Sequence, residues 1–381
     1  MKRSFLILLI TILIWALACG TALALDVDAE ASILIDASTG RILSEQNAHE
    51  KLAPASTTKI LTALLVLENV DDLSATVTLP ADFKNVGESS IYLEPGETLT
   101  YESLLYALML RSANDAAQAL AIGVAGSEDK FVEMMNARTE ELGLKDSHWT
   151  NPHGLDDPQH YTSAYDLAMI SKAAIEFPFF NEVVAATSYT LPWADYEYDR
   201  VIYNHNQFLD TYKDKGADGI KTGFTDNAGS CLVGSATQDS LRLIGVVLKA
   251  KEQDNGHYAA MAKLMDYGFE SYTAVELGKK GDVVGSVKVS GAKVGSVDVI
   301  LGSDVKMPMQ TDGNYQPQVT YDYPASLQAP VSADEPIGTA SFIDDIGNKV
   351  TVDLYLKESL DRYTFAIVFK QVWERFITVL L

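Results

Sequence analysis

The sequence predicts an α+β protein with one antiparallel sheet, a helical lobe, a small all-β domain and an amphipathic C-terminal helix. Three observations predict it. Strand-like segments open the chain, helical patterns fill its middle, and strands return near residue 220. This order is typical of a sheet built from both ends of one domain. After about residue 276 the segments are short and Val-rich, and the last 20 or so residues combine apolar bulk with Lys and Arg.

The composition excludes several classes of protein. The 381 residues include 52 acidic and 29 basic side chains, so the formal net charge is −23. Nucleic acid is excluded as a partner because phosphate binding needs a basic surface. Two cysteines cannot form a disulfide framework, and the six histidines form no HExxH pair. We therefore expect no metal and no cofactor.

Residues 1–24 are predicted to be a signal peptide. Lys2 and Arg3 precede an apolar run of 14 residues, from residue 5 to residue 18, which is short for a bilayer span. Ala22-Leu23-Ala24 then offers the small residues of a cleavage site. Cleavage after Ala24 would export the protein, whereas without cleavage the segment would remain as a membrane anchor.

The catalytic domain is expected over residues 25–275. Alternating or apolar segments predict strands, and 3.6-residue periodicity predicts helices. The expected strands are residues 31–35, 41–44, 220–224, 231–236 and 241–248, and the expected helices are residues 60–67, 101–110, 116–121 and 128–142. Residues 60–67 are apolar at nearly every position, which indicates a helix buried on all sides.

Residues 276–358 are expected to form a β-sandwich-like domain. Its predicted strands are residues 283–289, 292–300, 318–323 and 350–356, separated by Gly and Asp turns. In residues 359–381, apolar side chains recur near helical spacing and are interrupted by Lys370, Glu374 and Arg375. This pattern suits a helix lying on a membrane surface without spanning it. The alternative is a helix that packs on its own β domain.

The first of three short motifs is Ser56-Thr57-Thr58-Lys59, which follows Pro54 where a helix should begin. A spacing of three places Ser56 and Lys59 on one helix face. A desolvated lysine has a lowered pKa and can act as a general base for the serine nucleophile. Alone, the motif is better explained as an N-cap serine with a solvated lysine.

The second and third motifs are Ser112-Ala113-Asn114 and Lys221-Thr222-Gly223. We expect Ser112 to relay a proton to the leaving group and Asn114 to hold the substrate amide and Lys59, although both residue types also cap helices. Lys221 would keep Lys59 neutral and, with Thr222, attract a carboxylate. Gly223 would admit a substrate backbone beside the strand. Otherwise this motif is an exposed strand end.

Together the three motifs resemble those of penicillin-binding proteins and β-lactamases. Their longer contexts, Asn151-Pro152-His153-Gly154-Leu155 among them, resemble the low-molecular-mass penicillin-binding proteins that are serine-type D-alanyl-D-alanine carboxypeptidases. The resemblance covers residues 31–269.

The resemblance implies a penicillin-binding/β-lactamase-like fold and an exported enzyme at the outer face of the cytoplasmic membrane. This enzyme would remove the terminal D-alanine from peptidoglycan stem pentapeptides and bind β-lactams covalently. Ser56 would be the nucleophile, Lys59 its base, and the backbone N–H groups of Ser56 and Phe224 the oxyanion hole.

The chain departs from these families at two positions. His257 stands where the family often has a carboxylate-binding arginine, and Ala113 stands where β-lactamases typically have Asp. A β-lactamase would also need a deacylating glutamate in a Glu-x-x-Leu-Asn-like string, and none occurs. The other alternative is a non-catalytic peptidoglycan-binding protein, which the three complete motifs disfavour.

Overall fold

The computed structural model describes residues 25–193, 199–251, 256–311, 313, 316–344, 347–364, 369 and 373. The chain divides into two compact units. The first comprises residues up to 268 except 239–241, and the second comprises those three residues and everything from residue 269 onward. Each unit has a hydrophobic core of its own.

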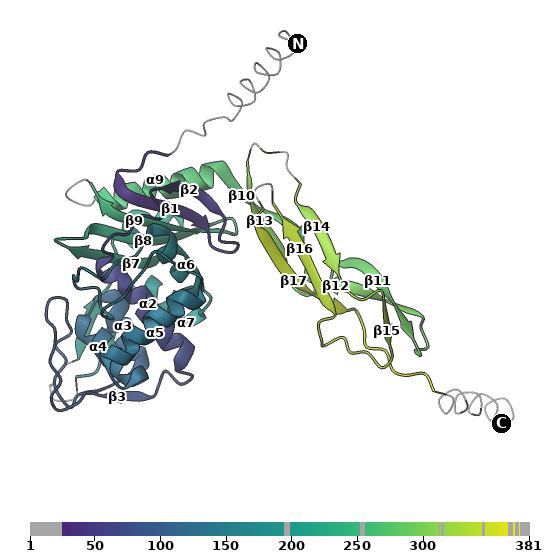
Figure 1. The fold of residues 1–381 in the computed structure, drawn as a ribbon, viewed down its shortest axis with the longest axis horizontal. Coiled ribbons are helices and arrows are strands. Elements are labelled where there is room, and N and C mark those ends of the chain that lie inside the picture. Colours follow the sequence, from purple (N-terminus) through teal and green to yellow (C-terminus); the bar gives the residue numbers. More distant parts are fainter. Residues whose placement is uncertain are drawn as a thin grey trace, which may run out of the picture. The chain divides into compact units, whose positions relative to one another are not determined.

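The first unit is organised around a five-stranded sheet with the strand order β2-β1-β9-β8-β7 (Figure 1). Strand β1 pairs antiparallel with β2 and β9, and β7 pairs antiparallel with β8. The prediction of a sheet built from both ends of the domain is therefore confirmed. The strands are β1 (Ala29–Asp36), β2 (Ile42–Gln46), β7 (Ala217–Thr225), β8 (Gly229–Gln238) and β9 (Leu241–Ala250).

Helices lie on both sides of this sheet (Figure 1). α9 covers one face, and the helical lobe of α2 to α7 lies on the other. The first eight residues of α2 are all buried, as their apolar sequence predicts. The helices are α2 (Lys59–Asn69), α3 (Tyr101–Leu110), α4 (Asn114–Ala125), α5 (Glu128–Glu141), α6 (Ala164–Ala174), α7 (Pro178–Ala185), α8 (Phe208–Thr211) and α9 (Gly256–Ser271).

Side-chain caps explain several helix starts. Thr100 accepts a hydrogen bond from the Ser103 N–H at 3.1 Å at the start of α3, and Ser163 accepts one from the Asp166 N–H at 3.1 Å at the start of α6. Such caps satisfy amide groups that have no partner within the helix. The start of α4 differs from the expected bounds of residues 116–121, because Asn114 is already its first residue and Ala113 occupies the cap position.

Several short elements of the helical lobe are not predicted by the sequence. Two small ladders pair β3 (Thr76–Thr78) with β4 (Thr98–Thr100) and β5 (Ser188–Leu191) with β6 (Arg200–Tyr203). Two short 3-10 helices, η1 (Ala55–Thr58) and η2 (Lys213–Lys215), complete the unit. Three or four residues are too few to show a strand periodicity.

Between residues 272 and 364, the regular structure described for the second unit consists of β strands. Its six-stranded sheet has the order β14-β16-β17-β12-β11-β15, and β10 pairs with β13. Strand β15 pairs parallel to β11, while the other strand pairs of this unit are antiparallel. The strands are β10 (Tyr272–Gly278), β11 (Val283–Ser290), β12 (Ser296–Leu301), β13 (Val305–Gln310), β14 (Gln318–Asp322), β15 (Ser326–Gln328), β16 (Gly338–Ile343) and β17 (Lys349–Leu356).

Two predicted segments fall on residues that the structure does not describe. The signal peptide, residues 1–24, lies wholly outside the described residues, and so does the predicted C-terminal helix, residues 359–381, apart from residues 359–364, 369 and 373. Residues 359–364 are not helical, because Leu360 and Arg362 form β-bridges with Val331 and Ala292, so the predicted start of the helix at residue 359 is wrong. Within the described part of the chain, no helix has the length and hydropathy needed to cross a membrane.

Candidate active site

Ser56 lies on a tight turn whose backbone is held by its threonine neighbours. The turn is η1, which leads directly into α2. Ala55 has a positive φ of 49°, an unusual conformation for a residue with a side chain. Thr57 Oγ1 donates to the Pro54 carbonyl at 2.7 Å, and Thr58 Oγ1 donates to the Ala55 carbonyl at 2.8 Å. These hydroxyl groups fix the peptide groups on both sides of Ala55.

A buried histidine supports the same turn from behind. The Thr150 N–H donates to His160 Nδ1 at 3.1 Å, so the ring proton is on Nε2, which lies 2.9 Å from Thr58 Oγ1. Burial lowers the pKa of His160 to about 4, which keeps the ring neutral. Gly154 packs closely as well, because a Cβ on it would overlap the Ala55 carbonyl and its φ is +90°. The segment 150–160 therefore packs against the Ser56 turn and supports its backbone.

Lys59 is fully buried and lies against Ser56. Its Nζ is 2.9 Å from Ser56 Oγ, 2.8 Å from Asn114 Oδ1 and 2.6 Å from the His153 carbonyl oxygen. A neutral amine has two protons and one lone pair. The amide oxygen of Asn114 and the carbonyl of His153 can accept only, so they take the two protons. The lone pair is then left for the Ser56 hydroxyl proton, which is the geometry of a general base.

The electrostatic surroundings favour the neutral amine. Burial lowers the pKa of Lys59 well below its usual value, and the positive charge of Lys221 lowers it further. The negative charges of Glu88 and Asp115 act in the opposite direction. Because burial is the largest cause, the balance is a strongly lowered pKa.

Lys221, Thr222 and Gly223 lie on β7, beside the Ser56 turn. A Cβ built on Gly223 would be 3.0 Å from the Pro54 oxygen and from the Ser56 and Thr57 nitrogens. The absence of a side chain at Gly223 therefore lets β7 approach the Ser56 turn. The sequence predicted only that Gly223 would leave room for a substrate backbone. Lys221 is buried and donates to the Thr222 carbonyl at 2.9 Å. Its pKa is lowered to about 7 by burial.

Ser112, Asn114 and Phe224 complete the predicted set. Ser112 is buried and has a positive φ of 60°, two residues before the Asn114 amide that meets Lys59. Phe224 follows Gly223 on β7, and its side chain is 65% exposed. Asn114 brings the second motif to Lys59, and Gly223 brings the third motif to the Ser56 turn.

His257 has the properties of a neutral ring. It is the second residue of α9, and burial lowers the pKa of its imidazole. A guanidinium remains charged at any physiological pH, so His257 is a poor substitute for an arginine.

Sequence reasoning missed two other cationic or titratable groups near Lys221. Arg111 Nη1 lies 3.1 Å from His205 Nε2, and the pKa of His205 is lowered by burial, then by the charges of Arg111 and Lys221. Arg111 directly precedes the second motif, but its neighbour His205 is distant in sequence. The main-chain carbonyl of His153 was also missed, because a sequence pattern does not show where a carbonyl points.

Two family models match the chain. One described as D-alanyl-D-alanine carboxypeptidase matches residues 19–252. Another, described as penicillin-binding protein 5, C-terminal domain, matches residues 272–362. The two matches fall on the two parts of the chain that differ in secondary structure.

Curated relatives match along most of the chain. The D-alanyl-D-alanine carboxypeptidase DacF of Bacillus subtilis is 31% identical over 363 residues, which cover 92% of this chain and 91% of the relative. The D-alanyl-D-alanine carboxypeptidase DacD of Escherichia coli is 33% identical, covering 84% of this chain and 83% of the relative.

Among solved structures, penicillin-binding protein 5 from Haemophilus influenzae is similar, with a TM-score of 0.70 and 27% identity over 88% of this chain and 98% of that one. A peptidoglycan synthesis regulatory factor from Streptococcus pneumoniae has a TM-score of 0.76 and 28% identity, covering 88% and 100% of the two chains.

Proposed function

The chain belongs to the family of serine-type D-alanyl-D-alanine carboxypeptidases, the low-molecular-mass penicillin-binding proteins, and from that premise we propose the details of its reaction. The protein removes the terminal D-alanine from peptidoglycan stem pentapeptides through an acyl-enzyme on Ser56. The observation that carries this proposal is the 2.9 Å approach of the buried Lys59 Nζ to Ser56 Oγ.

The proposed reaction proceeds in two steps. Lys59 accepts the hydroxyl proton of Ser56, and Ser56 Oγ attacks the carbonyl of the terminal peptide bond. The N–H groups of Ser56 and Phe224 stabilise the oxyanion. Lys59 passes this proton through Ser112 to the leaving nitrogen of D-alanine as the peptide bond breaks, which leaves Lys59 neutral again. Lys59 then takes a proton from the water molecule that attacks the ester and returns it to Ser56 Oγ, which releases the shortened peptide and restores the Ser56 hydroxyl.

Substrate recognition is assigned to the strand and to the second motif. Asn114 holds the substrate amide, while Lys221 and Thr222 bind the terminal carboxylate beside Gly223. The buried charge of Lys221 supports this assignment, because a carboxylate that enters the site pairs with it in a low-dielectric environment. No cofactor takes part. A β-lactam would acylate the same serine.

Release of D-alanine tests the proposed reaction. The mature chain should liberate free D-alanine from a synthetic pentapeptide that ends in D-Ala-D-Ala, and it should leave a peptide ending in L-Ala untouched. The product is measured with a coupled D-amino-acid oxidase assay. No release of D-alanine by folded protein would contradict the proposal.

Export and membrane association also belong to this proposal. We infer that residues 1–24 direct export and that residues 359–381 bring the enzyme to the outer surface of the cytoplasmic membrane. Phe369 and Trp373 support this inference, because they are four residues apart, 58% and 55% exposed, and stacked with ring centroids 6.2 Å apart. Paired exposed aromatic rings suit the membrane interface.

Truncation of the tail tests the membrane assignment. We expect the mature chain to sediment with membranes and a form that ends at Ser359 to stay in the supernatant while it still binds penicillin. A full-length variant with Phe369→Ser and Trp373→Ser keeps the length of the tail and is a second test. A larger share of this variant than of the unaltered mature chain should stay in the supernatant. Equal sedimentation of the full-length and truncated forms would show that the tail does not bind the membrane.

A further inference from the structure

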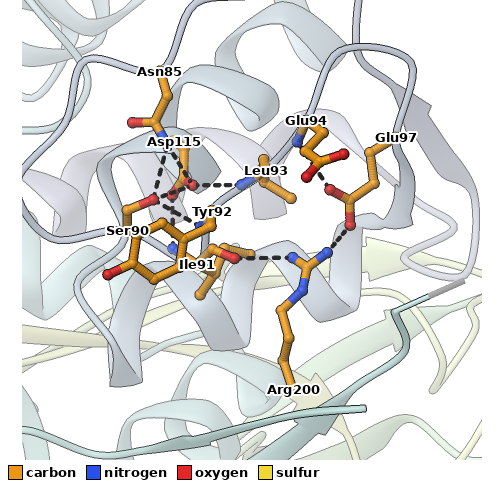
Figure 2. A network of polar contacts seen from close by, with 9 residues as sticks. All are labelled: Asn85, Ser90, Ile91, Tyr92, Leu93, Glu94, Glu97, Asp115 and Arg200. Carbon is orange, nitrogen blue, oxygen red and sulfur yellow. Dashed lines mark hydrogen bonds and ion pairs between the residues drawn. The ribbon is translucent and has the colours of Figure 1, made fainter. Parts of the chain in front are cut away.

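Asp115 is a fully buried carboxylate directly after Asn114, in the first turn of α4. Burying a carboxylate is costly unless donors replace its water. Figure 2 shows that the segment from Asn85 to Leu93 wraps around this side chain. Five donors surround its two oxygens: Asn85 Nδ2 at 3.0 Å, Ser90 Oγ at 2.6 Å, Ile91 N at 3.3 Å, Leu93 N at 3.0 Å and its neighbour Ala116 N at 3.0 Å.

These contacts hold the segment in a conformation that it would not otherwise prefer. Glu88 and Tyr92 have positive φ values of 59° and 60°, which carry a conformational cost for residues with a side chain. The N–H groups on both sides of Tyr92 donate to Asp115, and the Tyr92 N–H donates to Ser90 Oγ at 2.8 Å. Asp115 therefore fixes the turn at Tyr92.

A second anchor holds the other side of the same segment (Figure 2). Arg200 Nη1 donates to the Ile91 carbonyl at 3.2 Å, and its Nη2 pairs with Glu97. The N–H of Ile91 is thus held by Asp115 and its C=O by Arg200. Asp115 and Arg200 are both buried, so the two groups that hold Ile91 are shielded from water.

The anchored segment in turn orients Asn114. The Ser89 carbonyl accepts a hydrogen bond from the Asn114 N–H at 2.7 Å, and the Gly87 carbonyl accepts one from Asn114 Nδ2 at 3.0 Å. With its NH₂ group held by Gly87, the amide must present Oδ1 to Lys59 Nζ at 2.8 Å. A flipped amide would direct N–H groups at Lys59 and would compete for the lone pair.

We propose that Asp115 is a positioning residue for acyl transfer, which acts through the segment 85–93 on Asn114 and through Asn114 on Lys59. It touches neither the nucleophile nor the base. The proposal rests on the proposed role of Lys59 as the base, and it adds a residue that none of the three motifs contains.

Acylation kinetics of Asp115→Asn test the proposal. The amide keeps the size of the side chain but replaces one acceptor oxygen with a donor that faces N–H groups. We expect the limiting acylation rate constant with a chromogenic cephalosporin to fall on the order of 10–100-fold, because small displacements of catalytic groups have effects of that size. The dissociation constant of the initial noncovalent complex should stay near the wild-type value. Ser90→Ala, a milder change, should lower the rate constant roughly 2–10-fold.

Asp166→Asn is the matched control. Asp166 is equally buried and accepts from the Asp146 N–H at 2.8 Å and the Ser147 hydroxyl at 2.7 Å, but it holds a different loop. This variant should lose stability and keep its acylation rate constant. The positioning role would be overturned if folded Ser90→Ala and Asp115→Asn were acylated with the wild-type rate constant. It would also be overturned if Asp166→Asn lowered the acylation rate constant as much as Asp115→Asn does. Normal acylation in Lys59→Ala would instead overturn the proposed function.

Discussion

Replacing Lys59 with alanine should abolish acylation of Ser56 on any practical time scale. The substitution removes the amine whose Nζ lies 2.9 Å from Ser56 Oγ, and it leaves no other base placed to take the proton among the contacts described for Ser56. Loss of a general base typically lowers a rate by about 10²–10⁴-fold. The measurement is the rate of labelling by a fluorescent penicillin, with thermal melting to show that the variant is folded.

Thr62→Val provides a control for that experiment. Thr62 is one turn further along α2, is fully buried, and donates to the Pro152 carbonyl at 2.6 Å, so it contacts the same loop as Lys59. Its replacement removes a buried hydrogen bond without touching Ser56. Labelling should continue in Thr62→Val. If Lys59→Ala is labelled as fast as the wild type, Lys59 is not the base.

Affinity for a substrate that carries a terminal carboxylate should fall as the pH rises above 7. Burial lowers the pKa of Lys221 to about 7, and only the protonated form attracts an anion. A bound carboxylate raises that pKa, so binding takes up a proton, and the affinity decreases by up to about tenfold per pH unit above 7.

Two other groups near Lys221 cannot produce the same pH dependence. The pKa of His205 is lowered from 6.5 by burial and by the neighbouring positive charges, so His205 is already neutral at pH 7 and does not titrate above it. In the proposed reaction Lys59 acts as a neutral base, so its protonation changes the acylation rate constant and not the binding of the carboxylate.

Lys221→Ala should remove the pH dependence of binding and weaken the affinity. A hydrogen bond to a charged group contributes roughly 1.5–3 kcal/mol, which corresponds to a loss of about 10–100-fold in affinity. Binding of a non-hydrolysable peptide analogue, measured by calorimetry between pH 6 and 9, checks both effects. If the affinity of Lys221→Ala depends on pH in the same way as that of the wild type, Lys221 does not bind the substrate carboxylate.

The longer elements of the first unit could be predicted because their patterns are strong. The helix at Tyr101–Leu110 has the predicted bounds, and the strand at Ala29–Asp36 contains the predicted one. Each has enough apolar positions to show its period. The ladder from Thr76 to Thr78 with Thr98 to Thr100 has only three pairs and no such signal.

The motif residues could be found in the sequence, but what supports them could not. Ser56 and Lys59 are close in sequence, so helix geometry predicts their approach. The contact of Asp115 with residues 85–93 depends on how a loop folds back onto a helix, and the sequence shows Asp115 only as an acid in a first helical turn. In the same way, Gly223 approaches the Ser56 turn through sheet packing that no local pattern reveals.

Mass spectrometry of the penicillin-treated protein tests the central claim, that Ser56 is the nucleophile activated by Lys59. Lys59 Nζ lies 2.9 Å from Ser56 Oγ, and the sequence has no Glu-x-x-Leu-Asn-like string for a deacylating glutamate, so we expect the acyl-enzyme to persist. We predict one penicilloyl adduct per chain, located on the peptide that contains Ser56, with slow release of the drug. An adduct on another residue, or rapid turnover without a trapped adduct, would contradict the account.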